Sequence, residues 1–217
     1  MYNTVIFDMD GVLIDSEPIF REVEDEMLRE LGIEFTDEDF DYYVGRPGQE
    51  FWKEIIEKYD LKNLTVEEVF KDNVNRYIRR LKERENITLI NGVEYWIKRM
   101  KEDSKNIIIA SSSPQIIIDV VLDKFSIKKH FPKVIAGDSV EKGKPNPEIF
   151  LKAASVFDTP PDRCLVIEDS ANGIKAAKAA GMYCVAYRNE NSGVQNYGAA
   201  DYSISEFSKK EYDNIFK

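Results

Sequence analysis

Short runs of apolar and β-branched residues recur along the chain, each four or five residues long. Runs that are apolar at successive positions are typical of strands buried on both faces of a parallel sheet. They fall at residues 4–7, 106–110, 133–136, 164–167, 183–187 and 201–204. Segments with helical spacing separate the later runs, for example Val93, Trp96, Ile97 and Met100. Strands that alternate with single helices predict βαβ units in a mostly parallel sheet, and therefore an α/β fold.

The stretch after the first run breaks this rhythm, because it contains no convincing strand and at least three amphipathic helices. One is predicted to begin at Ser16 with Pro18 in its first turn and to stop at Gly32. Another begins at a capping-box pattern from Thr65 to Glu68. Their predicted buried positions are Ile19, Phe20, Val23, Met27 and Leu31 in the first helix, and Val69, Phe70, Val74, Tyr77, Ile78 and Leu81 in the second.

The turn signal Asn91-Gly92 marks the predicted return to the sheet. We therefore assign residues 1–15 and 90–217 to a sheet domain, and residues 16–89 to a helical insertion.

Composition excludes several classes of protein. The chain has 217 residues, 43% of them hydrophobic, which argues against disorder. Its 40 Asp and Glu against 30 Lys and Arg give a net charge of -10 without a basic block, which argues against nucleic acid or anionic membrane as a partner. The longest apolar runs are about four residues, far short of a bilayer span. We expect a soluble, cytoplasmic monomer.

Histidine and cysteine usage narrows the chemistry. His130 is the single histidine, so a multi-histidine metal site is impossible and catalysis is expected to depend on carboxylates. Cys164 and Cys184 lie in apolar runs that resemble buried strands, and we interpret them as reduced core residues.

Polar residues follow the predicted strands at their carboxyl ends, where open α/β sheets bind ligands. The first strand is followed by Asp8 and Asp10, the second by Ser111-Ser112-Ser113, and the fourth by Glu168-Asp169-Ser170. Gly143-Lys144-Pro145 lies between the third and fourth strands. Carboxylates, hydroxyls and one ammonium are thus predicted to share one crevice.

Each of these pieces has a purely structural alternative. Asp8 and Asp10 are spaced to share a hard cation or to divide nucleophile and acid roles, but Asp-x-Asp-Gly is also a common turn. Asp169 is equally placed to cap the helix that begins at Ser170. The serines are suited either to cap the helix opened by Pro114 or to bind an anion there. Lys144 alone is typical of a surface lysine.

Four of these motifs together resemble those of the haloacid dehalogenase-like hydrolase superfamily. The matching residues, in order, are Phe7-Asp8-Met9-Asp10-Gly11-Val12, Ser111, Lys144-Pro145 and Glu168-Asp169-Ser170. The helical insertion, entered through Asp15-Ser16-Glu17-Pro18, is similar to the cap of the β-phosphoglucomutase and sugar-phosphatase branch. The resemblance covers essentially the whole chain, and it implies a Rossmann-like core with an inserted α-helical cap domain.

The resemblance also implies roles for the aspartates. Asp8 is expected to be the nucleophile that forms an aspartyl-phosphate, and Asp10 the general acid and base. Family members that carry a long-lived phosphoaspartate have threonine at the second position, so Asp10 favours turnover. Mg²⁺ is expected to bind the Asp8 carboxylate, the Asp10 backbone carbonyl and Asp169. Glu168 is not assigned to this ligand set, because the resemblance implies that it lies behind the metal ligands or binds the metal only occasionally.

Phosphate and substrate binding are assigned in the same way. Ser111, Ser112 and Lys144 are expected to bind phosphoryl oxygens. In the cap, Arg46 is the candidate for contact with a phosphate or sugar oxygen, and its alternative is an exposed arginine at a helix entry. His130 matches no motif of the family.

The leading hypothesis is a Mg²⁺-dependent phosphatase for a small phosphomonoester such as a sugar phosphate. A β-phosphoglucomutase-type isomerase is the second hypothesis, but the mutases carry a histidine where this chain has Phe20. A receiver-like phosphorylation switch would not need about 75 helical residues after its first strand. Cleavage of carbon–halogen or carbon–phosphorus bonds is a further alternative, with Lys53 and Lys58 as cap lysines in no recognised context.

Overall fold

The computed structural model describes residues 2–43 and 47–216, which form two compact units. The sheet unit comprises Met1–Asp15 and Thr88–Lys217, and the helical unit comprises Ser16–Ile87. The chain therefore returns to the sheet unit at Thr88, two positions before the boundary drawn from the sequence. No helix in the part of the chain that is described has both the length and the apolar character required to cross a bilayer.

The sheet unit contains one six-stranded sheet in the order β3-β2-β1-β4-β5-β6. Every neighbouring pair of strands is parallel, which confirms the predicted α/β class. The strands are β1 (Thr4–Phe7), β2 (Asn106–Ala110), β3 (Val134–Ile135), β4 (Cys164–Glu168), β5 (Tyr183–Tyr187) and β6 (Tyr202–Ile204). β3 is shorter than the predicted 133–136 because it lies at an edge and pairs only with β2. The central strand β1 pairs with β2 and β4, which lie far along the chain.

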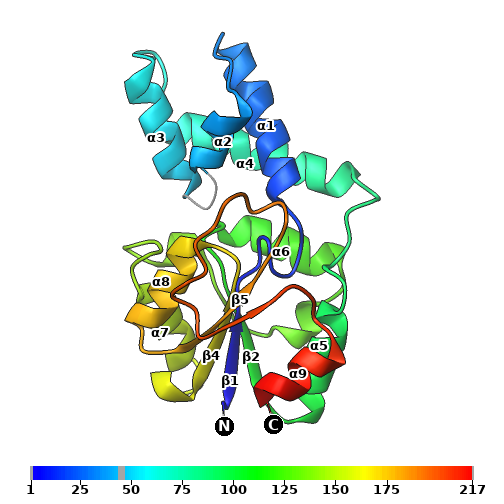
Figure 1. The fold of residues 1–217 in the computed structure, drawn as a ribbon. Helices are drawn as coiled ribbons and strands as arrows, with labels where there is room; N and C mark the ends of the chain where they lie inside the picture. The colour runs from blue at the N-terminus through cyan, green and yellow to red at the C-terminus, as the bar shows by residue number, and fades with distance from the viewer. Residues whose placement is uncertain (1, 44–46, 217) are drawn as a thin grey trace. The chain divides into compact units, whose positions relative to one another are not determined.

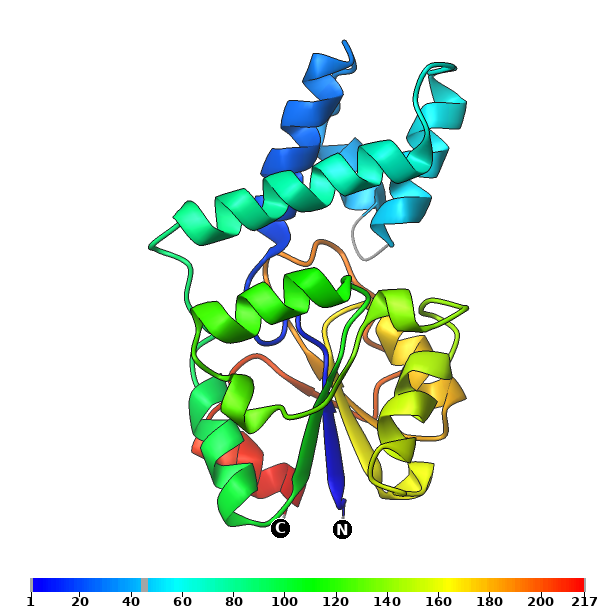
Figure 2. The same ribbon diagram turned by 180° about the vertical axis from the view of Figure 1, so that it is seen from behind.

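Helices cover both faces of this sheet (Figures 1 and 2). α7 (Glu148–Ser155) and α8 (Ala171–Ala179) lie on one face, and α5 (Val93–Glu102), α6 (Gln115–Lys124) and α9 (Lys209–Phe216) lie on the other. Short 3-10 turns at Lys128–His130, Gly137–Ser139 and Pro161–Arg163 complete the connections. Alternate strand residues such as Ile6, Ile108 and Val166 pack against α7 and α8 in a continuous core. Cys164 and Cys184 are buried free thiols, as predicted.

The helical unit consists of α1 (Glu17–Glu30), α2 (Asp37–Tyr43), α3 (Gly48–Lys58) and α4 (Val66–Glu83). The predicted capping box is confirmed: the Glu68 amide donates to Thr65 Oγ1 at 3.2 Å, and the Thr65 amide donates to the Glu68 carboxylate at 3.3 Å. The core of the unit includes Trp52 and Ile55 of α3, which the periodicity argument did not single out. Four predicted core positions are only half-buried, namely Phe20, Leu31, Phe70 and Ile78.

A ladder of ion pairs joins α1 to α4. Carboxylates spaced four residues apart on α1 pair with guanidinium groups that have the same spacing along α4 and at the residue after its end. Residues four apart lie on the same face of a helix, so the two charged faces meet. The carboxylates are Glu22, Glu26 and Glu30, and the cations are Arg76, Arg80 and Arg84. Networks of this kind stabilise more than isolated exposed pairs, and here Glu22, Glu26, Arg76 and Arg80 each have at least two partners of opposite charge.

Candidate active site

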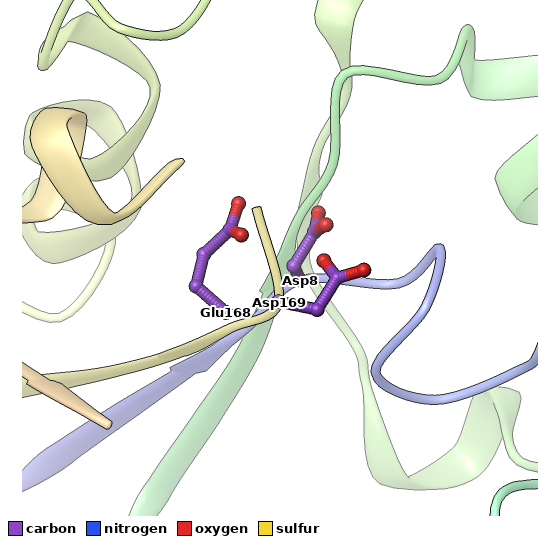
Figure 3. A group of neighbouring side chains, drawn as sticks. All are labelled: Asp8, Glu168 and Asp169. Carbon is purple, nitrogen blue, oxygen red and sulfur yellow. The ribbon is translucent and has the colours of Figure 1, made fainter. Parts of the chain in front are cut away.

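Three carboxylates meet at the carboxyl end of the sheet, beyond β1 and β4 (Figure 3). Asp8 follows β1 directly, Glu168 ends β4, and Asp169 comes next. Because Phe7 pairs with Ile167 in register, the residues after them lie side by side. The three side chains are buried, and one oxygen from each lies within 4.8 Å of the others.

Lys144 ties two of these carboxylates together. Its Nζ donates to Asp8 Oδ1 at 3.0 Å, to Glu168 Oε1 at 2.7 Å and to the carbonyl of Ala110 at 3.3 Å. Burial alone would lower the pKa of this ammonium, but the charges of Asp8 and Glu168 raise it above its ordinary value. Lys144 is 7% exposed, so the surface-lysine alternative is wrong. The Lys144–Glu168 pair was not expected from the motifs.

The surroundings of Asp8, the candidate nucleophile, disfavour the ionised form of its carboxyl. Burial raises the pKa of its carboxyl to about 7, with Lys144 opposing the shift and Glu168 and Asp10 adding to it. One ammonium thus only partly offsets the charge of the cluster. A further cation close to these oxygens would favour the ionised form of Asp8.

Two glycines allow the carboxylates to sit where they do. A Cβ atom on Gly173 would lie 1.7 Å from Glu168 Oε1, and one on Gly11 would lie 1.9 Å from Asp169 Oδ2. Gly11 also has a φ of +73°, a conformation that other residues rarely adopt. Any larger residue at either position would displace a carboxylate of the cluster.

Asp10 is held apart from this cluster by hydroxyl groups. Its Oδ2 accepts hydrogen bonds from Ser113 Oγ at 2.7 Å and from Ser111 Oγ at 3.3 Å. The side chain of Asp10 is not one of the three clustered carboxylates, which leaves its backbone carbonyl as the group that the resemblance assigns to a metal. Ser111 is buried and Ser112 is exposed. Ser113 was missed as a partner of Asp10.

The helix-cap alternatives are wrong for Asp169 and for the serines. Ser170, not Asp169, is the N-cap of α8, and its Oγ accepts from the amide of Gly173 at 3.0 Å. The N-cap of α6 is Pro114, and the first amide of that helix, from Gln115, donates to Asp138 at 3.2 Å. Asp169 instead accepts a hydrogen bond from Ser192, a residue beyond β5 that no motif predicted.

The donor set fits a hard divalent cation. Asp8, Glu168 and Asp169 offer only oxygen atoms, they are buried, and they carry more negative charge than Lys144 neutralises. Buried charges of one sign are costly unless a counter-ion lies among them. Mg²⁺ prefers carboxylate oxygens of this kind.

The remaining predicted residues are placed as follows. Arg46 lies outside the described residues. Phe20 stacks on Tyr77 within the helical unit, with ring centroids 4.1 Å apart. Lys53 and Lys58 are exposed, whereas a lysine that forms a Schiff base is activated by burial or by a neighbouring cation. His130 is half-buried at the end of a 3-10 turn.

Comparison with known proteins gives consistent results. Residues 5–187 match the family described as haloacid dehalogenase-like hydrolase. The phosphorylated carbohydrates phosphatase of Thermotoga maritima is 32% identical over 178 residues, which cover 82% of this chain and 81% of that protein. The fructose-1-phosphate phosphatase YqaB of Escherichia coli is 30% identical over 197 residues, which cover 86% of this chain and 97% of that protein. The crystal structure of β-phosphoglucomutase from Clostridium difficile is similar, with a TM-score of 0.83 and 25% identity. The match covers 99% of this chain and 96% of that chain.

The charge cluster predicts how Asp8 titrates without metal. Carbon-13 NMR of the metal-free chain should show a carboxyl that titrates near pH 7 and is absent from Asp8→Asn. The pKa of Asp8 in the folded chain lies above its ordinary value of 3.8, so protonation of this carboxyl stabilises the folded state. This stabilisation is fully present below pH 3.8 and is lost as the pH rises through about 7. The stability of the parent relative to Asp8→Asn should therefore fall across this range. An Asp8 carboxyl that titrates near pH 4 would contradict the electrostatic interpretation.

Proposed function

The chain belongs to the haloacid dehalogenase-like hydrolase family, and we propose that it is a Mg²⁺-dependent phosphatase that acts on small phosphorylated metabolites, in particular sugar phosphates. It is an enzyme that hydrolyses phosphoric monoesters. The observation that carries the proposal is the buried cluster of Asp8, Glu168 and Asp169 around Lys144, with Asp10 beside it. The phosphatases of Thermotoga maritima and Escherichia coli support the choice of sugar phosphates.

In the first step of the proposed reaction, an oxygen of Asp8 attacks phosphorus and forms an aspartyl-phosphate. The bond between phosphorus and the ester oxygen breaks, and the leaving alkoxide takes a proton from the Asp10 carboxyl. Lys144 supports this step because its hydrogen bond to Oδ1 fixes the orientation of the Asp8 carboxylate. The Asp10 carboxyl is held in turn by the hydroxyl of Ser113.

In the second step, water attacks the phosphorus of the aspartyl-phosphate. Asp10, now ionised, accepts the proton of this water, the bond between phosphorus and Asp8 breaks, and inorganic phosphate leaves. Both residues return to their starting states, so one carboxyl group serves as acid and then as base. A side chain with this double role needs a fixed position, which the 2.7 Å hydrogen bond from Ser113 Oγ provides.

Phosphoryl oxygens are proposed to bind Ser111, Ser112 and Lys144. Ser112 is exposed next to the buried Ser111, so its hydroxyl is accessible to a ligand. Ser111 would exchange its 3.3 Å bond to Asp10 for one to phosphate. Lys144 would exchange its longest contact, the 3.3 Å bond to the Ala110 carbonyl.

Asp8, Asp169 and the backbone carbonyl of Asp10 are proposed to hold Mg²⁺, with Glu168 adjacent. When bound, the cation offsets the repulsion between the anionic nucleophile and the anionic phosphate. The raised pKa of Asp8 supports this role, because the carboxylate must be ionised to attack.

A β-phosphoglucomutase-type isomerase is the second candidate, favoured by the structural similarity to that enzyme from Clostridium difficile. Phe20 opposes it, since this aromatic side chain is stacked on Tyr77 at the position where the mutases carry histidine. With glucose 1-phosphate, glucose 6-phosphate and fructose 1-phosphate as substrates, we expect phosphate release as the main product. Interconversion of the two glucose phosphates, measured by coupled dehydrogenase assay and faster than phosphate release, would instead support the mutase.

Replacement of the nucleophile gives the most direct test. Asp8→Asn should lower the release of p-nitrophenol from p-nitrophenyl phosphate by at least about a thousandfold, because the amide cannot form the phosphoenzyme. Asp162→Asn, an exposed aspartate in the turn before β4, serves as the matched control and should retain the parent rate. Turnover by a folded Asp8→Asn variant at the parent rate would refute the assignment.

Removal of metal should also stop turnover. In excess EDTA we expect the rate to fall to the level of Asp8→Asn, and excess Mg²⁺ should restore it. Circular dichroism recorded alongside would show whether the chain stays folded. Undiminished activity in EDTA would rule out the metal role while leaving the assignment of Asp8 open to its own test.

A further inference from the structure

The segment after β5 returns to the carboxylate cluster. It runs from Arg188 to Gly198 and lies outside the four motifs that identify the family. At its middle, the hydroxyl of Ser192 donates a hydrogen bond to Oδ2 of Asp169. Ser192 is 3% exposed although Asn191 and Val194 of the same loop are exposed, so the loop turns the Ser192 hydroxyl inward.

Several hydrogen bonds hold the loop in place on both sides of Ser192. Before it, Asn189 Nδ2 donates to the carbonyl of Gly11 at 3.0 Å. After it, the Ala171 amide at the start of α8 donates to Gln195 Oε1 at 2.8 Å, and Gln195 Nε2 donates to the Ser192 carbonyl at 2.8 Å. The loop is thus attached to the segments that carry Asp10 and Asp169.

The contact between Ser192 and Asp169 lies directly against Gly11. A Cβ atom placed on Gly11 would lie 1.9 Å from Asp169 Oδ2 and 3.1 Å from Ser192 Oγ. The glycine therefore leaves room for the carboxylate and for the hydroxyl that binds it. With Oδ2 fixed by the hydroxyl and Gly11 on one side, the Asp169 carboxylate has one defined orientation towards Asp8 and Glu168.

We propose that Ser192 is a positioning residue that sets the orientation of Asp169 and thereby the affinity of the site for a divalent cation. This inference rests on the proposed metal role of the carboxylate cluster. A carboxylate free to rotate must be ordered when the cation binds, whereas one held by a hydroxyl is already ordered. Removal of a residue that hydrogen bonds to a metal ligand typically lowers the affinity for the metal by about 10–100-fold.

The test is isothermal titration calorimetry, in which the metal-free full chain is titrated with Mg²⁺ and the Kd is measured. Ser192→Ala should raise the Kd by about tenfold or more. Ser192→Thr, which keeps the hydroxyl, should stay within about threefold of the parent. Asn196→Ala is the matched control, because this exposed residue of the same loop accepts from the amide of Gly198 at 2.9 Å, and its Kd should match the parent.

Thermal unfolding of each metal-free variant separates positioning from a merely structural role. A structural role predicts a lower melting temperature with an unchanged Kd, and that result would overturn the proposal, as would equal losses of affinity in Ser192→Ala and Asn196→Ala. If Ser192→Ala does not fold, the Kd of Ser192→Thr for Mg²⁺ tests the proposal in its place. A Kd raised about tenfold in this variant, which keeps the hydroxyl, would overturn the proposal. If the parent binds no Mg²⁺, the proposed metal role and this inference both fail; if the parent binds and Ser192→Ala binds equally well, only this inference fails.

Discussion

Burial of several negative charges at one point is the constraint on which the site depends. Asp8, Glu168 and Asp169 are withdrawn from water at the ends of two adjacent strands, and Lys144 hydrogen bonds to two of them. Removal of the Lys144 ammonium from this buried set would be strongly destabilising, because the carboxylate charges would be left uncompensated. The register of the parallel sheet imposes this arrangement, since pairing of Phe7 with Ile167 places the following acids side by side. The fold itself therefore gathers an excess of buried negative charge at this point.

The sheet was predictable because its strands are buried on both faces and therefore consist of continuous apolar runs. β1, β2 and β5 begin and end where the apolar runs do, whereas the edge strand β3 is shorter than its run. Asp8, Asp10, Lys144 and Asp169 were predictable because parallel strands place their carboxyl ends at one edge of the sheet. In the helical unit the capping box of α4 was readable from four residues, because it is a local hydrogen-bond pattern.

Contacts between distant segments were not predictable in this way. The ion pair between Lys144 and Glu168, and the hydrogen bond from Ser192 to Asp169, each join residues more than twenty positions apart without a recurring spacing. Ser113 was overlooked because three serines in succession look alike until the turn that aims each of them is known. Gly173 was not singled out from the sequence, and its lack of a side chain is explained by the position of the Glu168 carboxylate.

The placement of β1 at the centre of the sheet has a consequence for how the protein is made. β1 leaves the ribosome before the other strands of this sheet, but its two neighbours begin at Asn106 and Cys164. Until then, Asp8 has none of the partners that bury it and is an ordinary solvated aspartate. The helical unit is complete well before that point, because its chain is continuous from Ser16 to Ile87. Synthesis thus yields the insertion first, and the carboxylate cluster assembles only once most of the chain has emerged. A topology with so many non-local contacts is expected to fold slowly.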